Sequence, residues 1–250
     1  MIGSLDARDA QIEFSGSESE PRSAGYQLRA LADRIVDAPY EQHAGRYAFH
    51  HKKTWGDPVL TSADGRHHMA FASETRIWEA ADGGGRQITT QLEPQFPDQR
   101  SRDYWSRRMP VTAARTPEVL ELPPWDMAPM PVDRARLTAF LKVQYGAGAA
   151  CKEVGTLYGR YAVPRRIRAD VLRILADVPG FLWRGEVTDR AGRKGVAITL
   201  DDREHDQQNL LIFNPTTGEL LASEIVSLFA PVRIGSYQLI LATDRTDTLG

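Results

Sequence analysis

The sequence has little of what marks a disulfide-rich, membrane-spanning or nucleic-acid-binding protein. Its single cysteine, Cys151, excludes an intramolecular disulfide. No run of 18 apolar residues occurs, so no segment is expected to cross a membrane as a helix. The net charge of −2 gives no bulk attraction to nucleic acid, and we predict no nucleic-acid partner. Hydrophobic residues make up 42% of the chain and charged residues 26%, which is typical of a globular domain with a real core.

Catalytic signatures are also missing. The chain contains no GxSxG, HExxH or CxxC motif, and the three glycines at 83–85 lack the context of a phosphate-binding loop. Cys151 has no histidine in its local sequence, so we interpret it as a small buried hydrophobe on a helix. We therefore predict no catalytic residues, no cofactor and no enzymatic activity.

Two histidine pairs, 50–51 and 67–68, come closest to a metal site. Adjacent residues on a strand face opposite sides of a sheet, so each pair offers one imidazole to each side. A hairpin that turns at residues 60–61 would place His51 near Ala70 and leave the histidines offset along the strands. Zinc requires three or four converging ligands, so we predict no metal site. A metal-dependent hydrolase that uses these strand histidines remains an alternative.

Two blocks of strands flank a helical middle. Alternating or apolar runs predict strands at 45–55, 66–80, 86–92, 181–187, 194–200, 209–213 and 237–243. Apolar residues at helical spacing predict helices at 22–38, 133–143, 147–161 and 164–177. Tight turns are predicted at 189–193 and 214–218, where Asp, Asn and Gly supply turn chemistry. Because strands and helices come in blocks, the pattern indicates an α+β fold with an antiparallel sheet.

The segment 94–131 is rich in proline, which excludes long regular elements there. We predict one short edge strand within it, at Val119–Leu122. Five arginines accompany Tyr104 and Trp105, and we interpret this part as a solvated face or a lid over an apolar groove. The arginines are Arg100, Arg102, Arg107, Arg108 and Arg115.

The sequence predicts two parts, a short N-terminal tail and one large domain. Residues 1–21 are polar and rich in Ser and Glu, and they lack the basic and apolar parts of a signal peptide. We expect them to form a flexible N-terminal tail or to include a remnant of cloning, and we expect residues 22–250 to form a single α+β domain.

Three stretches carry a resemblance to a known family: LADRIVDAP…GRYAFHHKKTW, VPRRIRADVLRILADVPGFLWRGEVTDRAGRKGVAI and LLIFNPTTGELLASE. Together they resemble an actinobacterial family of membrane-anchored, anti-sigma-like proteins over roughly Leu28 to Asp244. The most specific part is the order helix, Pro-Gly, strand, TDxxGRxGVA, strand, FxPxTGxLL. This chain lacks the transmembrane helix and cytosolic portion of that family, so the resemblance implies an ectodomain.

The family's ectodomain looks similar to the LolA/RseB-type lipoprotein-carrier fold. The resemblance therefore implies a curved antiparallel sheet, or half-barrel, packed on two to four α-helices. It also implies a non-catalytic, extracytoplasmic binding or sensing domain with an apolar groove for a lipid, a lipoprotein or an envelope protein partner. Membrane contact would come through an anchor outside this chain. A structural protein–protein interaction module and a cytoplasmic location are the alternatives.

Aromatic residues on the alternating strands and in the proline-rich segment are our candidates for lining such a groove. They are Tyr47, Phe49, Trp55, Phe71, Trp78, Tyr104, Trp105 and Trp125.

Overall fold

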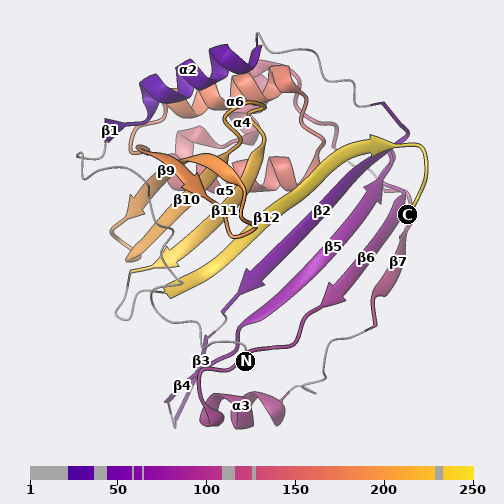
Figure 1. The fold of residues 1–250 in the computed structure, drawn as a ribbon, viewed down its shortest axis with the longest axis vertical. Helices are drawn as coiled ribbons and strands as arrows, with labels where there is room; N and C mark the ends of the chain where they lie inside the picture. Colours follow the sequence, from indigo (N-terminus) through magenta and orange to yellow (C-terminus); the bar gives the residue numbers. More distant parts are fainter. Residues whose placement is uncertain are drawn as a thin grey trace.

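A computed structural model describes residues 22–36, 44–57, 59–63, 65–108, 116–125, 128–228 and 233–250. The predicted N-terminal tail, residues 1–21, and the arginine at 115 lie outside this range. The described part contains a ten-stranded sheet, a separate two-stranded hairpin and five α-helices (Figure 1). The sheet is open, curved and antiparallel throughout, which confirms the predicted α+β class.

The sheet joins the two strand blocks in one surface. Its order is β1-β8-β9-β10-β11-β12-β2-β5-β6-β7. In chain order the strands are β1 (Arg22–Ser23), β2 (Tyr47–Gly56), β5 (Phe71–Glu79), β6 (Gly85–Gln91), β7 (Glu118–Leu122), β8 (Leu182–Thr188), β9 (Lys194–Asp202), β10 (Gln207–Phe213), β11 (Leu220–Ser227) and β12 (Arg233–Thr246). The long β12 pairs with β2, from Ser236 opposite Gly56 to Thr246 opposite Tyr47. This seam brings together segments almost 200 residues apart, as Figure 1 shows.

Four of the five helices form a group beside the β8–β12 half of the sheet (Figure 1). They are α2 (Gly25–Val36), α4 (Arg134–Phe140), α5 (Ala147–Arg160) and α6 (Arg165–Asp177), with a 3₁₀ turn, η1 (Val143–Tyr145), before α5. Within the described residues, none of the helices combines the length and apolar character needed to span a bilayer.

The fifth helix, α3 (Gln99–Ser106), lies apart, next to the β3–β4 hairpin (Figure 1). It forms in the proline-rich segment, where the sequence pattern did not indicate a helix. Asp98 caps its start by accepting a hydrogen bond from the Ser101 backbone N–H at 2.6 Å. No proline occurs between Pro97 and Pro110, which leaves room for two helical turns.

Alternate residues of β9 and β10 supply two cores, one on each face of the sheet. Leu211 and Phe213 pack with the helices in the larger core, which also contains Cys151 of α5, buried as predicted. Leu210 and Ile212 face the other way and join a smaller buried cluster. Arg190, in the turn between β8 and β9, forms an ion pair with the Glu224 carboxylate of β11 at 2.9 Å.

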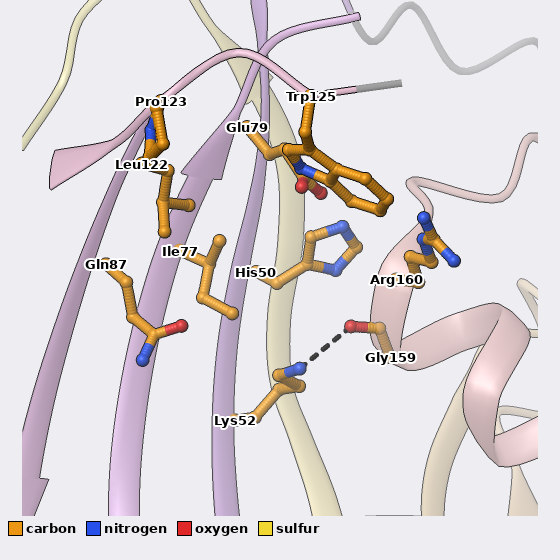
Figure 2. A pocket seen from close by; sticks show the side chains of 10 residues that line it. All are labelled: His50, Lys52, Ile77, Glu79, Gln87, Leu122, Pro123, Trp125, Gly159 and Arg160. Carbon is orange, nitrogen blue, oxygen red and sulfur yellow. Dashed lines mark hydrogen bonds between the residues drawn. The ribbon is translucent and has the colours of Figure 1, made fainter. Parts of the chain in front are cut away.

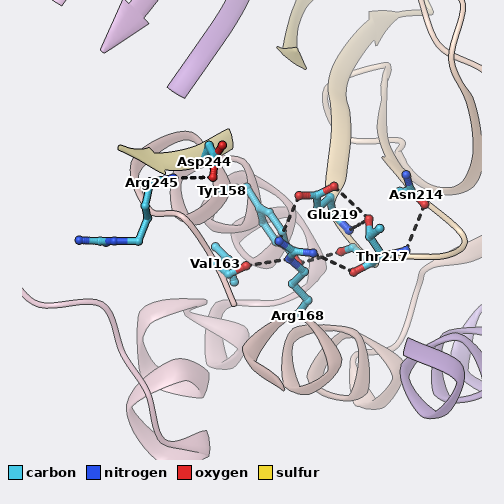
Figure 3. Close-up of polar contacts among 9 residues, drawn as sticks. Tyr158, Val163, Arg168, Asn214, Thr217, Glu219, Asp244 and Arg245 are labelled. Carbon is cyan, nitrogen blue, oxygen red and sulfur yellow. Dashed lines mark hydrogen bonds and ion pairs between the residues drawn. The ribbon is translucent and has the colours of Figure 1, made fainter. Parts of the chain in front are cut away.

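A buried arginine fastens the 214–218 turn to the helices (Figure 3). Arg168 of α6 is 2% exposed and donates to the backbone oxygens of Val163 and Thr217, and it pairs with Glu219 at 3.0 Å. Within the turn, the Asn214 side chain accepts from backbone N–H groups, and Gly218 has φ of +69°, as the turn chemistry predicts. The turn is therefore a structural joint between sheet and helix.

The single strand predicted at 66–80 is wrong in its middle, because the strand is interrupted at Met69 and two separate strands form instead. Residues 59–62 and 65–68 form a small hairpin, β3 (Val59–Ser62) and β4 (Gly65–His68), that leaves the main sheet. The Met69 side chain is buried in a cluster with aromatic residues of α3, and the chain bends where this side chain is buried. The turn expected at 60–61 is therefore strand, and His51 lies opposite Arg76 of β5 rather than near Ala70.

Candidate functional site

A pocket of about 440 Å³ opens between the helix-bearing face of the β2–β7 half of the sheet and the C-terminal end of α5 (Figure 2). Its walls combine apolar and charged side chains from four strands, one helix and the loop after β7. The lining residues are His50, Lys52, Ile77, Glu79, Gln87, Leu122, Pro123, Trp125, Gly159 and Arg160.

Strand alternation and register explain why these residues meet. On β2, His50 and Lys52 point toward α5, because side chains two apart share a face. His50 is opposite Ile77 of β5, and Ile77 is opposite Gln87 of β6, so one row across three strands forms the floor. Glu79 lies on the same face of β5, two residues after Ile77.

Polar contacts close the helix side of the pocket. The Lys52 ammonium donates to the backbone oxygen of Gly159 at 2.9 Å, as Figure 2 shows. A cation near the C-terminal carbonyls of a helix is favoured by the helix dipole. The Arg160 guanidinium lies 4.9 Å from the centre of the Trp125 ring, a cation–π contact that draws the loop after β7 toward α5. The pocket is therefore framed by both sheet and helix.

His50 is the most unusual residue of the site. It is 1% exposed, and among the described residues neither Nδ1 nor Nε2 makes a well-formed hydrogen bond, the Arg160 backbone providing only a weak one. Burial, and next the Lys52 charge, lower the pKa of His50 to about 4, against a smaller opposing effect of the Arg160 backbone. The imidazole is thus neutral at pH 7, with one donor and one acceptor nitrogen, both of them buried at the edge of the cavity.

The two charged groups beside His50 are shifted by the same burial. Desolvation lowers the pKa of Lys52, and the Glu79 carboxylate partly offsets this effect. Desolvation also raises the pKa of Glu79, while Trp125, Arg160 and Lys52 act in the opposite direction. Both groups are thus partly desolvated, which makes their electrostatic interactions with a bound molecule stronger than in bulk water.

Of the eight aromatic groove candidates, Trp125 is the one that the structure places in this pocket. The candidates on β2 and the Trp78 side chain lie on the opposite face of the sheet. Phe49 and Trp78 pack there with ring centres 5.0 Å apart, and Trp55 stacks on Tyr237 across the β2–β12 seam at 5.8 Å. Tyr47 and Phe71 lie at opposite ends of these paired strands, and Phe71 is 40% exposed.

Tyr104 and Trp105 form a different cluster. Both belong to α3, and their side chains are buried together with Met69. The Tyr104 ring stacks on His67 with centres 3.8 Å apart, and the Arg108 guanidinium covers it at 3.7 Å. Tyr104 and Trp105 therefore hold α3 onto the β3–β4 hairpin.

The strand histidines engage separate carboxylates. His51 Nε2 lies 2.6 Å from Glu74, and His68 Nδ1 lies 3.1 Å from Asp57. Among the residues that the structure describes, no three His, Cys, Asp or Glu side chains gather in a way that could hold a metal ion. This geometry gives no support to a hydrolase built on these histidines.

Sequence reasoning missed nine of the ten lining residues: it chose the wrong face of β2 for the site, and it proposed none of the lining residues of β5, β6, β7 and α5. The aromatic face looks like the inner one when the strand is taken alone. The signal for the other face is weak: His50 and Lys52 alternate with those aromatics, and Ile77 and Glu79 do the same on β5. Only the position of α5, a tertiary contact, decides which face is covered.

Comparison of the chain with protein-family models gives no match, and comparison with curated proteins gives none either. Two solved structures match at 14% identity with TM-scores of 0.32: MucB in complex with MucA(peri), and the MucA/MucB complex of Pseudomonas aeruginosa. They align with 91% and 90% of this chain, which spans 56% and 58% of theirs. A DUF1329 family protein from Desulfovibrio piger matches at 10% identity and a TM-score of 0.22, over 92% of this chain and 95% of its own. At these values the likeness carries no argument about function.

Proposed function

We propose that the chain is a non-catalytic binding or sensing domain that takes up an amphipathic ligand in the pocket between β2, β5 and α5. The observation that carries this proposal is a cavity of about 440 Å³ whose walls join apolar side chains to polar ones that are buried or half-buried. Ligand sites in proteins are typically concave and mostly apolar, with a few polar groups that fix orientation. Ile77, Leu122 and Trp125 supply the apolar wall, and His50 and Lys52 the polar end.

The cellular location and the class of natural ligand are proposed from the sequence resemblance. The resemblance of residues 28–244 to an anchored ectodomain family supports an extracytoplasmic location, with an anchor outside this chain. It also supports a lipid, a lipoprotein or an envelope protein as the natural ligand or partner.

Native mass spectrometry after incubation with a lipid extract tests the proposal. The intact protein is expected to retain one small amphipathic molecule. Gln87→Trp fills the floor of the pocket and is expected to abolish retention. Ile88→Trp is the matched control, because it places the same side chain on the other face of the same strand. No retention by the parent protein, or equal retention by Gln87→Trp, would contradict the proposal.

A second candidate function, a protein-interaction module, is favoured by the edge of the sheet. β7 is the terminal strand, and Val119 and Leu120 are 57% and 50% exposed on its two faces. Such an edge offers backbone N–H and C=O groups to an extended partner segment. Val119→Lys, on the face of β7 away from the pocket, is expected to weaken partner binding while leaving ligand retention unchanged, as measured by co-purification and mass spectrometry. Loss of retention together with partner binding would argue against a separate interaction edge.

A further inference from the structure

We propose that the pocket selects a ligand with a singly charged anionic head group, a carboxylate being the simplest, held by His50 and Lys52 at its polar end. The apolar remainder of the ligand lies against Ile77, Leu122 and Trp125. This inference rests on the proposed function, because it names the chemistry of the molecule that the same pocket binds.

The first argument is the unsatisfied imidazole. His50 is fully buried at the edge of the cavity, and among the described residues its ring nitrogens make no well-formed hydrogen bond, only a weak contact with the Arg160 backbone. A buried polar group without a well-formed hydrogen bond is unfavourable, so native proteins rarely keep one without a reason. A ligand atom that accepts a hydrogen bond from the neutral ring would satisfy it. A carboxylate oxygen is such an acceptor.

The second argument is the balance of charge. Among the described residues that line the pocket, Lys52 and Arg160 are cationic and Glu79 is the one acid. This leaves an excess of one positive charge on the walls of the pocket. One anionic group would neutralise it, whereas a cationic ligand would add to it and would meet the like charge of two half-buried cations.

The third argument is geometric. The Lys52 ammonium has three N–H donors and uses one of them for the Gly159 backbone oxygen. Figure 2 shows its nitrogen directed toward the Gly159 oxygen, on the same side of the strand as the His50 ring. Lys52 therefore has donors left for a carboxylate in the pocket, and a rotation of the His50 ring would bring a second donor to it.

The apolar part of the pocket explains why a free anion is not the expected ligand. Ile77, Leu122 and Pro123 contribute hydrocarbon surface beside the polar end, and the Trp125 indole covers it. Burial of an apolar chain contributes about 25 cal/mol for each Å² removed from water. The ligand class that fits both ends is an acyl chain ending in a carboxylate.

The experiment compares two probes of equal chain length on the intact protein. Isothermal titration with decanoate and with 1-decanol at pH 7 is expected to show at least about tenfold tighter binding of decanoate. Lys52→Met is expected to remove this preference, and Lys52→Arg, which keeps the charge, to retain most of it. Lys53→Met is the matched control, because Lys53 lies on the opposite face of β2 and its loss is expected to leave both affinities unchanged.

His50→Leu separates a binding role from a structural one. It removes the unsatisfied nitrogens, so its thermal stability is expected to equal or exceed that of the parent. Its affinity for decanoate is expected to fall about tenfold, while its affinity for decanol does not fall. A destabilised His50→Leu protein with unchanged decanoate binding would assign His50 to folding and overturn its role here.

The outcomes distinguish this inference from the function on which it rests. If neither probe binds, the proposed function fails and the inference fails with it. If decanol binds as tightly as decanoate, the pocket binds amphipathic molecules but does not discriminate between their head groups. In that case the inference alone is overturned. If acetate binds as tightly as decanoate, the site takes free anions, which also overturns it.

Discussion

The two halves of the sheet differ in how they use their faces. In the β8–β12 half, consecutive residues Val196, Ala197 and Ile198 are all buried, since one face packs on the helices and the other on a second cluster. In the β2–β7 half, His50 is the one fully buried residue of β2, and it faces a cavity. The comparison indicates that one half supplies stability while the other keeps space for a ligand. Substitutions in the two halves should therefore have opposite signatures.

The largest expected effect on stability lies in the β8–β12 half. Arg168→Met removes the partner of Glu219 and of two backbone oxygens, so it should lower the free energy of unfolding by about 3–5 kcal/mol. Urea denaturation followed by circular dichroism measures this loss. A loss below about 1 kcal/mol would show that the joint between α6 and the 214–218 turn contributes little, and would weaken the contrast between the halves.

Truncation of matched aliphatic side chains sharpens the contrast. Leu211 is 0% exposed in the helix-facing core, so Leu211→Ala should cost about 3 kcal/mol in the free energy of unfolding. Ile77 is half-buried and borders the open pocket, so Ile77→Ala should cost about 1 kcal/mol or less in the same urea titration. Equal losses would mean that the pocket wall is packed as tightly as the core.

The pH dependence of stability reports on the pocket itself. The pKa of His50 is about 4 in the folded protein against 6.5 when unperturbed, so between these values the unfolded chain binds a proton that the folded one does not. The stability linked to this residue is fully present above pH 6.5 and is lost as the pH falls toward 4, by up to about 3 kcal/mol. Urea titrations from pH 4.5 to 7 should therefore show a smaller decline for His50→Leu than for the parent. Parallel curves would contradict a neutral, buried imidazole.

The smallest effect is expected at the seam between the halves. Trp55 of β2 stacks on Tyr237 of β12 on the face opposite the pocket. Trp55→Leu should lower the free energy of unfolding by about 1 kcal/mol, because it removes one aromatic pair and leaves the backbone ladder intact. Decanoate affinity should not change, and a change would show that the two faces of β2 are coupled.

Local chemistry explains which parts of the fold were predictable. The turns at 189–193 and 214–218, the edge strand at 118–122 and the helices after Pro131 follow from turn residues, caps and apolar spacing. The break at Met69 and the helix α3 were not predictable in the same way, because both depend on a cluster that brings Met69 to Tyr104 and Trp105. Arg168 also needed the structure, since its burial depends on carbonyl partners from distant segments.

The site was less predictable than the fold. Aromatic residues on β2 indicated the face that lines a groove, but the structure leaves these residues half-buried on the face away from the pocket. Among the predicted groove residues, Trp125 is the one that lines this pocket. His50 was visible in the sequence as part of a histidine pair, yet its burial without a well-formed hydrogen bond arises only once α5 covers β2.

The five tryptophans provide the most direct test of a ligand site between β2, β5 and α5. Each indole N–H gives its own signal in a ¹H–¹⁵N correlation spectrum, and substitution of Trp125 assigns the one in the pocket. On titration with decanoate, we predict that the Trp125 signal shifts in a saturable way while those of Trp105 in the α3 cluster and Trp183 on β8 stay in place. An unmoved Trp125 signal, or a saturable shift at Trp183 instead, would contradict the account.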